Sequence, residues 1–132
     1  MRNLTGIRFG MIDVVSNPTG QELPFPAEFA LSGNFLLDNA GKRVQYGMDS
    51  PPLLPTLTGA TALGNDFSED GGHGLATGTG RFMGVTTDFS VDFYVSEAGM
   101  SALVTIGKGG NLPGGKPVEL SISVAEAWQA GP

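Results

Sequence analysis

The clearest pattern along the chain is an alternation of apolar and polar side chains from Asp88 to Val95. The apolar members are Phe89, Val91, Phe93 and Val95, and a polar residue stands between each pair. Successive side chains of a β-strand point to opposite faces of the sheet, so this pattern predicts a strand with one apolar face. Such a face must be buried, which places these side chains inside a β-sheet protein.

Six further segments show the same two-residue rhythm and are predicted to be strands. They are Leu4–Val15, Glu28–Leu37, Lys42–Met48, Leu57–Leu63, Met100–Ile106 and Val118–Val124. In the first of them, Ile7, Phe9 and Met11 share one face, and Arg8 lies on the other with Gly10. Phe9 is expected in the core or in a ligand cavity with the other phenylalanines. The Arg8 face is also a candidate for the interior, so both alternatives stay open.

Glycine, proline and asparagine mark the connections between these strands. Asn17–Gly20 predicts a turn, and Asp38–Gly41 predicts a hairpin. The other predicted connections are Asp49–Thr56 as a loop or an edge crossing, Gly64–Gly72 as an acidic loop, a glycine-dense turn that begins at Gly71, and Lys108–Lys116 as the longest flexible connection. Ala125–Ala130 is the only segment that could form a helical turn, and it is too short to be a stable helix alone.

The predicted strands must bury their apolar faces against one another. No segment has a sustained apolar period of three to four residues, so no helix of ordinary length is expected. The 132 residues suit one domain, and no linker or internal repeat divides them. We therefore predict that residues 1–132 form a single all-β domain, an antiparallel β-barrel of about eight strands, with a β-sandwich as the alternative.

Charge and missing motifs exclude several classes of function. The chain has 7 Lys and Arg against 13 Asp and Glu, a net charge of −6, which disfavours nucleic acid and anionic membranes as partners. It has no cysteine, no phosphate-binding loop, no dinucleotide fingerprint and no Gly-x-Ser-x-Gly elbow. We therefore expect no cofactor and no metal. The N-terminus lacks the apolar run of a signal peptide, so a cytoplasmic protein is expected.

One segment carries a resemblance to a known family. Gly78-Thr-Gly-Arg-Phe-Met-Gly84, preceded by Ala76-Thr77, is similar to the Gly-x-Gly-(Lys/Arg)-(Phe/Tyr)-x-Gly segment of the allene oxide cyclase and dirigent barrels. Small bacterial spirotetronate-type cyclases on the same barrel carry a similar segment. The resemblance implies a barrel in which Phe82 plugs the interior and Arg81 caps the open end. It further implies a cofactor-independent cyclase or isomerase that folds a small apolar substrate in a cavity, and a homo-oligomer.

Such a cyclase needs few catalytic groups, because the shape of the cavity selects the reactive conformation of the substrate. The candidate acids, bases or donors to a substrate carbonyl are Arg8, Tyr46, His73 and Tyr94. The candidates to line a substrate cavity are Phe9, Phe35, Arg81, Phe93 and Trp128. For each of these residues an ordinary structural role is the alternative.

The acidic segment offers two further hypotheses. Glu69 or Asp70 could supply the carboxylate that orients His73 as a general base, although a solvated loop histidine is the favoured interpretation. With Asn65 and Asp66, the same carboxylates could bind calcium. Their spacing does not match an EF-hand loop, so a solvated acidic loop is favoured.

Two hypotheses of function follow, and they differ in what the barrel should contain. A cyclase requires an enclosed cavity lined by phenylalanines and by one or more of Arg8, Tyr46, Tyr94 and Arg81. The alternative is a non-catalytic barrel or sandwich module for assembly, or for binding a ligand such as a carbohydrate or a lipid. An interior filled by side chains favours this second hypothesis.

Overall fold

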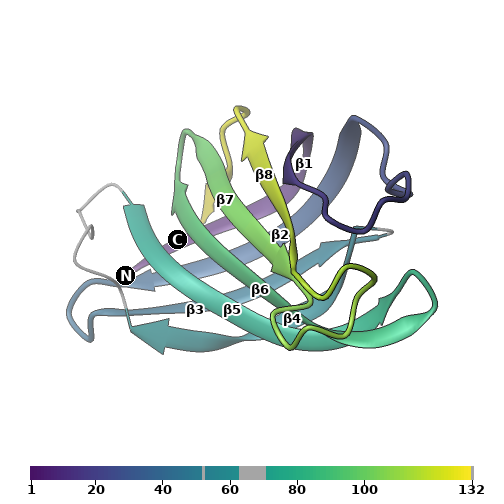
Figure 1. Ribbon diagram of the computed structural model, residues 1–132. Helices are drawn as coiled ribbons and strands as arrows, with labels where there is room; N and C mark the ends of the chain where they lie inside the picture. The colour runs from purple at the N-terminus through teal and green to yellow at the C-terminus, as the bar shows by residue number, and fades with distance from the viewer. Residues whose placement is uncertain (52, 63–70, 132) are drawn as a thin grey trace.

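The computed structural model describes residues 1–51, 53–62 and 71–131. Over these residues the chain forms β-strands and no helix (Figure 1). The strands are β1 (Arg2–Ser16), β2 (Glu28–Asp38), β3 (Arg43–Ser50), β4 (Leu54–Ala62), β5 (Gly71–Phe82), β6 (Val85–Ser96), β7 (Gly99–Ile106), β8 (Val118–Val124) and β9 (Gln129–Gly131). Each segment predicted as a strand overlaps one of these strands, so the all-β prediction is confirmed.

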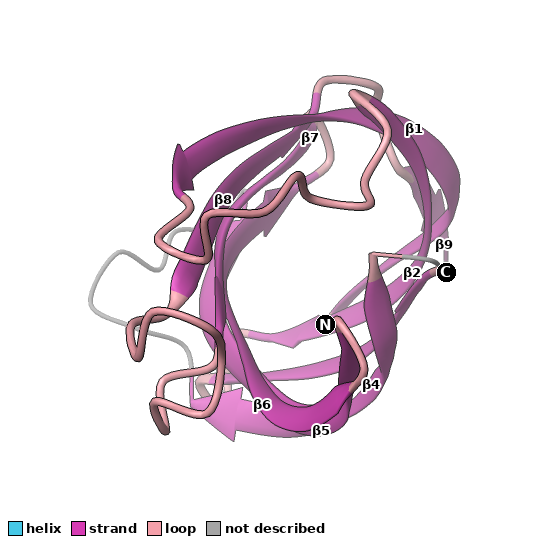
Figure 2. Ribbon diagram, turned by 45° about the vertical axis from the view of Figure 1, so that its right-hand side comes forward, coloured by secondary structure: helices cyan, strands magenta, loops and turns pink. Residues whose placement is uncertain are grey.

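The strands form one antiparallel sheet that curls into a nearly closed barrel. The hydrogen-bonded order is β4-β3-β2-β1-β8-β7-β6-β5, and the short β9 pairs with β1. β4 and β5, the two ends of this order, contact each other. Figure 2 shows the strands encircling a common interior. The predicted barrel is therefore confirmed, and the sandwich alternative is not.

Alternating side chains of the strands form a single hydrophobic core inside the barrel. On β2, Phe35 and Leu37 are fully buried, whereas Asn34 faces outward and is exposed. On β6, Phe93 and Val95 are fully buried in the same way. Burial of an apolar side chain of this size contributes about 1.5–3 kcal/mol. Burial of these alternating apolar side chains therefore supplies the free energy that closes the sheet.

Aromatic rings fill the middle of the barrel. Phe35 and Phe93 come from opposite walls, and their ring centroids lie 5.8 Å apart. Trp128 packs edge-on against Phe35 at 5.4 Å, and Tyr46 packs edge-on against Phe93 at 5.6 Å. These contacts join the two walls directly. Side chains thus occupy the space that looks open between the ribbons in Figure 2.

The glycine-rich segment predicted as a turn is instead a strand. Gly71–Phe82 is continuous and pairs with β6 along its whole length. A Cβ on Gly74 would lie 2.8 Å from the Phe93 ring, and a Cβ on Gly78 would lie 2.5 Å from the Leu57 side chain. These glycines make room for large neighbours on other strands. The turn prediction was wrong because the sequence does not show which side chain faces a glycine.

The prediction that Phe9 lies in the core or in a cavity is also wrong. Phe9 is 64% exposed on the outer face of β1. The opposite face of β1 is the inner one, as Gly10 shows. A Cβ on Gly10 would lie 2.6 Å from the backbone oxygen of Ser123 and 2.7 Å from the Phe29 ring. Because Ser123 and Phe29 approach Gly10 so closely, the face of β1 that carries this glycine lies inward. Ile7, Phe9 and Met11, on the opposite face, therefore point outward.

The connection over residues 107–117, predicted as flexible, is held to β6 by hydrogen bonds. The Asp88 carboxylate accepts bonds from the backbone N–H groups of Lys108, at 3.0 Å, and Gly109, at 3.2 Å. The Asn111 side chain makes two more hydrogen bonds to β6. Leu112 is buried in the core. Polar anchors and apolar burial therefore hold the first half of this connection, from Lys108 to Leu112, against the barrel.

Three other connections differ from expectation in smaller ways. Most of Asp49–Thr56 belongs to strands, because β3 extends to Ser50 and β4 begins at Leu54. The C-terminal segment forms no helical turn, and Gln129–Gly131 pairs with β1 as β9. The acidic segment lies almost wholly outside the described residues; only its last two glycines belong to β5.

Candidate functional site

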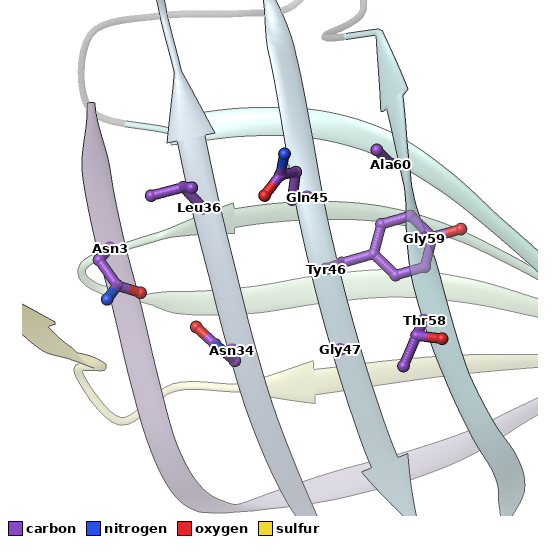
Figure 3. A pocket seen from close by; sticks show the side chains of 9 residues that line it. All are labelled: Asn3, Asn34, Leu36, Gln45, Tyr46, Gly47, Thr58, Gly59 and Ala60. Atoms are coloured by element: carbon purple, nitrogen blue, oxygen red, sulfur yellow. The ribbon is translucent and has the colours of Figure 1, made fainter.

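The outer face of β1–β4 carries an open hollow of about 470 Å³ (Figure 3). Four adjacent strands contribute its lining, which consists of Asn3, Asn34, Leu36, Gln45, Tyr46, Gly47, Thr58, Gly59 and Ala60. Figure 3 shows the carboxamides of Asn3, Asn34 and Gln45 on three neighbouring strands. This hollow is the candidate functional site.

The register of the strands sets the layout of the hollow. Asn34 on β2 stands opposite Gly47 on β3, which stands opposite Thr58 on β4. In the next row, Leu36 stands opposite Gln45. Residues directly opposite each other in an antiparallel pair point to the same face, so these side chains share the outer surface. Gly47 has no side chain, which leaves the depression between its taller neighbours.

Tyr46 reaches the hollow from the inner face of β3. Its phenol lies against Gly59 of β4, where a Cβ would come within 2.7 Å of the Tyr46 hydroxyl oxygen. The ring also packs edge-on against Phe93. A side chain in place of Gly59 would displace the tyrosine, so the phenol can occupy this position only because residue 59 is a glycine. Tyr46 thereby connects the packed core with the margin of the hollow.

The lining of the hollow is polar but uncharged. It contains three carboxamides, one threonine hydroxyl and one phenol, and none of its lining residues carries a formal charge. A carboxamide offers both a hydrogen-bond acceptor and two donors. The hollow can therefore form hydrogen bonds in both directions with a ligand, whereas it offers no ion pair and no nucleophile with an adjacent base.

A second hollow, of about 350 Å³, lies on the outer face of β5–β8 and includes His73 and Asp92. The Nε2 atom of His73 contacts Oδ1 of Asp92, as a hydrogen bond or, when the ring is protonated, as an ion pair. The two side chains are 33% and 53% exposed. Pairs this exposed contribute little to stability, about 0–1 kcal/mol. The expected loop position of His73 is wrong, because the residue belongs to strand β5.

Five of the predicted site residues gather in one cluster inside the barrel. Phe35, Phe93 and Trp128 are almost fully buried, and Tyr46 packs against them. The Arg8 guanidinium lies 5.8 Å from the centre of the Trp128 ring and donates a hydrogen bond to the backbone carbonyl of Ile7 at 2.8 Å. These residues fill space and pack against one another, as core side chains do.

The other predicted residues lie apart from that cluster. Phe9 is on the outer face of β1, and His73 and Tyr94 are on the outer face of β5 and β6. Arg81 donates a hydrogen bond to the carbonyl of Gly84, within its own hairpin, at 2.8 Å. The structure does not bring the nine predicted residues together into one site.

Phe82, expected from the family resemblance to plug the barrel, is buried and stacks on Phe25 with ring centroids 5.5 Å apart. The residues that sequence reasoning missed are the carboxamides of the hollow, Asn3, Asn34 and Gln45, and the carboxylate partner of His73, Asp92. Asn34, Gln45 and Asp92 stand at outward positions of predicted strands, and Asn3 directly precedes the predicted strand Leu4–Val15. The sequence signal that could have identified them is their place at the polar positions of the alternating pattern, which face outward from the sheet.

Within residues 1–51, 53–62 and 71–131, no cluster of three or more His, Cys, Asp or Glu side chains could hold a metal ion. The hypotheses that involve Asn65, Asp66, Glu69 and Asp70 fall outside the described residues. The part of the chain that the structure describes also has no helix that is long and apolar enough to cross a membrane.

Comparison with known proteins leaves the family open. The sequence matches no family model, and neither a curated protein nor a solved structure is significantly similar to it. The resemblance to the allene oxide cyclase and dirigent barrels therefore stays a prediction.

Proposed function

We propose that this protein is a non-catalytic β-barrel module that binds a neutral, polyhydroxylated ligand, such as a carbohydrate chain, in the hollow over β1–β4. The observation that carries the proposal is the set of three carboxamides, Asn3, Asn34 and Gln45, around one uncharged depression. They stand on three hydrogen-bonded neighbouring strands, so the sheet holds them in fixed relative positions.

The chemistry of the lining favours hydroxyl groups over other ligands. A sugar hydroxyl both donates and accepts hydrogen bonds, and a carboxamide can accept from it and donate to it at the same time. An apolar ligand would leave the amides without partners, at a cost of about 1–3 kcal/mol for each group that becomes buried. A charged ligand would find no opposite charge among the lining residues.

The shape of the hollow suits a ligand that lies along the surface. Its volume of about 470 Å³ falls within the range of roughly 300–1,000 Å³ that is usual for small-molecule sites. Gly47, Gly59 and Ala60 give it a low floor, over which a ring can approach the backbone closely. The hollow is open rather than enclosed, as a site for one unit of a longer chain would be.

The packing of the interior is the reason to prefer binding over the cyclase hypothesis. A barrel cyclase needs a cavity in which a flexible substrate can fold. The candidates for that cavity, Phe35, Phe93 and Trp128, contact one another across the barrel and are almost fully buried. The two hollows described above lie on the outer face of the sheet.

The proposal is tested by screening the protein against neutral oligosaccharides of varied linkage and measuring affinity for the best of them by calorimetry. The variants Asn34→Ala and Gln45→Ala should each weaken binding by about three- to tenfold, because each removes one or two hydrogen bonds. The matched control is Gln21→Ala, which changes an exposed amide residue outside the hollow and should leave the affinity unchanged.

Two results would contradict the proposal. One is the absence of binding to any neutral oligosaccharide at millimolar concentration. The other is an affinity that responds equally to Gln21→Ala and to the two variants in the hollow. Thermal unfolding of each variant verifies that the barrel is intact, since both hollow positions are exposed.

A further inference from the structure

β4 and β5 close the barrel without pairing with each other. Each has a hydrogen-bonded neighbour on one side only, β3 for β4 and β6 for β5, because they are the two ends of the strand order. Among the described residues, no backbone hydrogen bond joins these two strands. Figure 2 nevertheless shows them side by side, and they contact each other. This contact, here called the seam, is therefore made by side chains.

Along the seam, side chains of β4 occupy the space above glycines of β5. Three such contacts, here called the seam contacts, are Pro55 with Gly80, Leu57 with Gly78, and Thr61 with Gly74. Residue numbers rise on β4 as they fall on β5, so the two strands run antiparallel. The tightest contact is the middle one, where a Cβ on Gly78 would lie 2.5 Å from the Leu57 side chain. The seam thus depends on side chains fitted against glycines.

Burial on the inner face is incomplete beside the seam. Every inward residue of β2 is buried, whereas on β4 only Leu54 and Leu57 are buried and the inward Gly59 is exposed. Tyr46, which lies against Gly59, is only partly buried although its ring packs on the core. Segments with little buried apolar surface and an unpaired backbone edge open at a lower free energy than the core. β4 has both properties.

We infer that the barrel opens and recloses along the β4–β5 seam while the other strand pairs stay intact. Separating any other two neighbours in the strand order breaks a ladder of backbone hydrogen bonds, but separating β4 from β5 breaks none. In the open form the sheet ends at β4 on one side and at β5 on the other. Inner positions beside the seam, such as the fully buried Ala76 on β5, then become accessible to small molecules. The open form is a minor state in equilibrium with the closed barrel.

Leu57 is the main determinant of the closed form. It is the only one of the three β4 side chains in the seam contacts that is buried, since Pro55 and Thr61 are partly exposed. Opening returns its apolar surface to water, and this cost is what keeps the seam closed. A smaller side chain at position 57 should therefore shift the equilibrium toward the open form.

Labelling of introduced thiols with an aromatic disulfide reagent measures the opening, because the chain has no cysteine of its own. Ala76→Cys places a thiol on the inner face beside the seam, and the matched control Ala102→Cys places one on the inner face of β7, away from it. Ala76 is 0% exposed and Ala102 is 8% exposed, so the closed barrel alone predicts slower labelling at residue 76. Opening along the seam predicts labelling at least tenfold faster at residue 76. Equal rates, or a faster rate at residue 102, overturn the inference.

Substitution of Leu57 tests whether the seam contacts control the opening. Leu57→Ala should raise the ratio of the labelling rate at residue 76 to that at residue 102 at least fivefold, because it weakens the seam alone. The matched control is Leu37→Ala, since Leu37 is also buried but lies on β2. Its loss favours unfolding of the whole barrel, which exposes both thiols alike, so the ratio should not rise. An equal rise of the ratio in the two variants overturns the inference.

Hydrogen exchange of the wild-type protein tests the inference without any substitution, and so decides it even where a cysteine variant fails to fold. In the open form the β3–β4 ladder is the end of an open sheet, whereas the β7–β8 ladder stays in its middle. Amides that join β3 and β4 should therefore exchange at least tenfold faster than amides that join β7 and β8. Equal protection of the two ladders overturns the inference.

Discussion

Phe35 on β2 and Phe93 on β6 meet across the barrel, with ring centroids 5.8 Å apart and ring planes at 45°. Both side chains are fully buried. In the order of the sheet, β1, β8 and β7 separate their strands, so the contact ties opposite walls together. The centre of the barrel is a packed junction. The hollow proposed for ligand binding accordingly lies on the outside of the sheet.

The first prediction concerns that junction. Phe93→Ala should lower the free energy of unfolding by about 3–5 kcal/mol, because it removes a buried ring and leaves a cavity between the walls. Denaturant unfolding measures the change. The matched control is Phe9→Ala, the same substitution at a 64% exposed position, which should cost less than about 1 kcal/mol. Similar losses at the two positions would contradict the packing described.

A second prediction concerns the inward glycines of β5. A Cβ on Gly74 would lie 2.8 Å from the Phe93 ring and 2.9 Å from both Thr61 and Val44 side chains. Gly74→Ala should therefore destabilise the protein by about 1–3 kcal/mol through overpacking. At Gly47 a Cβ meets nothing closer than 3.9 Å, so Gly47→Ala should be neutral or slightly stabilising. Thermal unfolding of the pair checks both signs.

A third prediction concerns the connection that follows β7. Asp88→Ala removes the carboxylate that accepts bonds from the backbone N–H groups of Lys108 and Gly109. The loss should be about 1–3 kcal/mol, with faster hydrogen exchange at those two amides. Asp13→Ala, at an exposed position of β1, should change neither quantity. Unchanged exchange in the Asp88 variant would show that Leu112 and the Asn111 hydrogen bonds hold the connection without the carboxylate.

A fourth prediction concerns the pair on the second hollow. A double-mutant cycle of His73→Ala and Asp92→Ala should give a coupling free energy below about 1 kcal/mol, because both side chains are substantially exposed. Denaturant unfolding of wild type, both single variants and the double variant provides the four values. A coupling above about 2 kcal/mol would mean that the pair is more shielded from solvent than its exposure indicates.

Much of the fold could be predicted because most strands carry their own evidence. Residues such as Phe93 and Val95 alternate with polar neighbours, and that local rhythm is enough to locate a strand and its buried face. The prediction failed where the evidence was not local. Gly74 and Gly78 are typical of a turn when only their own segment is considered, but the side chains that need their space belong to other strands.

The candidate site could not be predicted, because its residues come from different strands that become neighbours only in the folded sheet. Asn3, Asn34 and Gln45 are ordinary outward-facing residues in the sequence. They become a group only because β1, β2 and β3 lie side by side in a register that aligns Asn3 with Leu36 and Leu36 with Gln45. The nine residues proposed from the sequence were chosen by chemical type, and type alone does not determine position.

The sequence by itself determined that this chain is all-β, since alternation along each strand is a local property, and it left both a barrel and a sandwich open as ways to bury the apolar faces. The contact between β4 and β5, the two ends of the strand order, decided for the barrel. The tertiary structure decided which side of β1 faces water, because that choice depends on the contacts of Gly10 with Phe29 and Ser123. It also decided that the rings of Phe35 and Phe93 fill the interior, because only the pairing order places their strands on opposite walls. Contacts between segments far apart in the sequence set these outcomes, so no single segment of the sequence is enough to predict them.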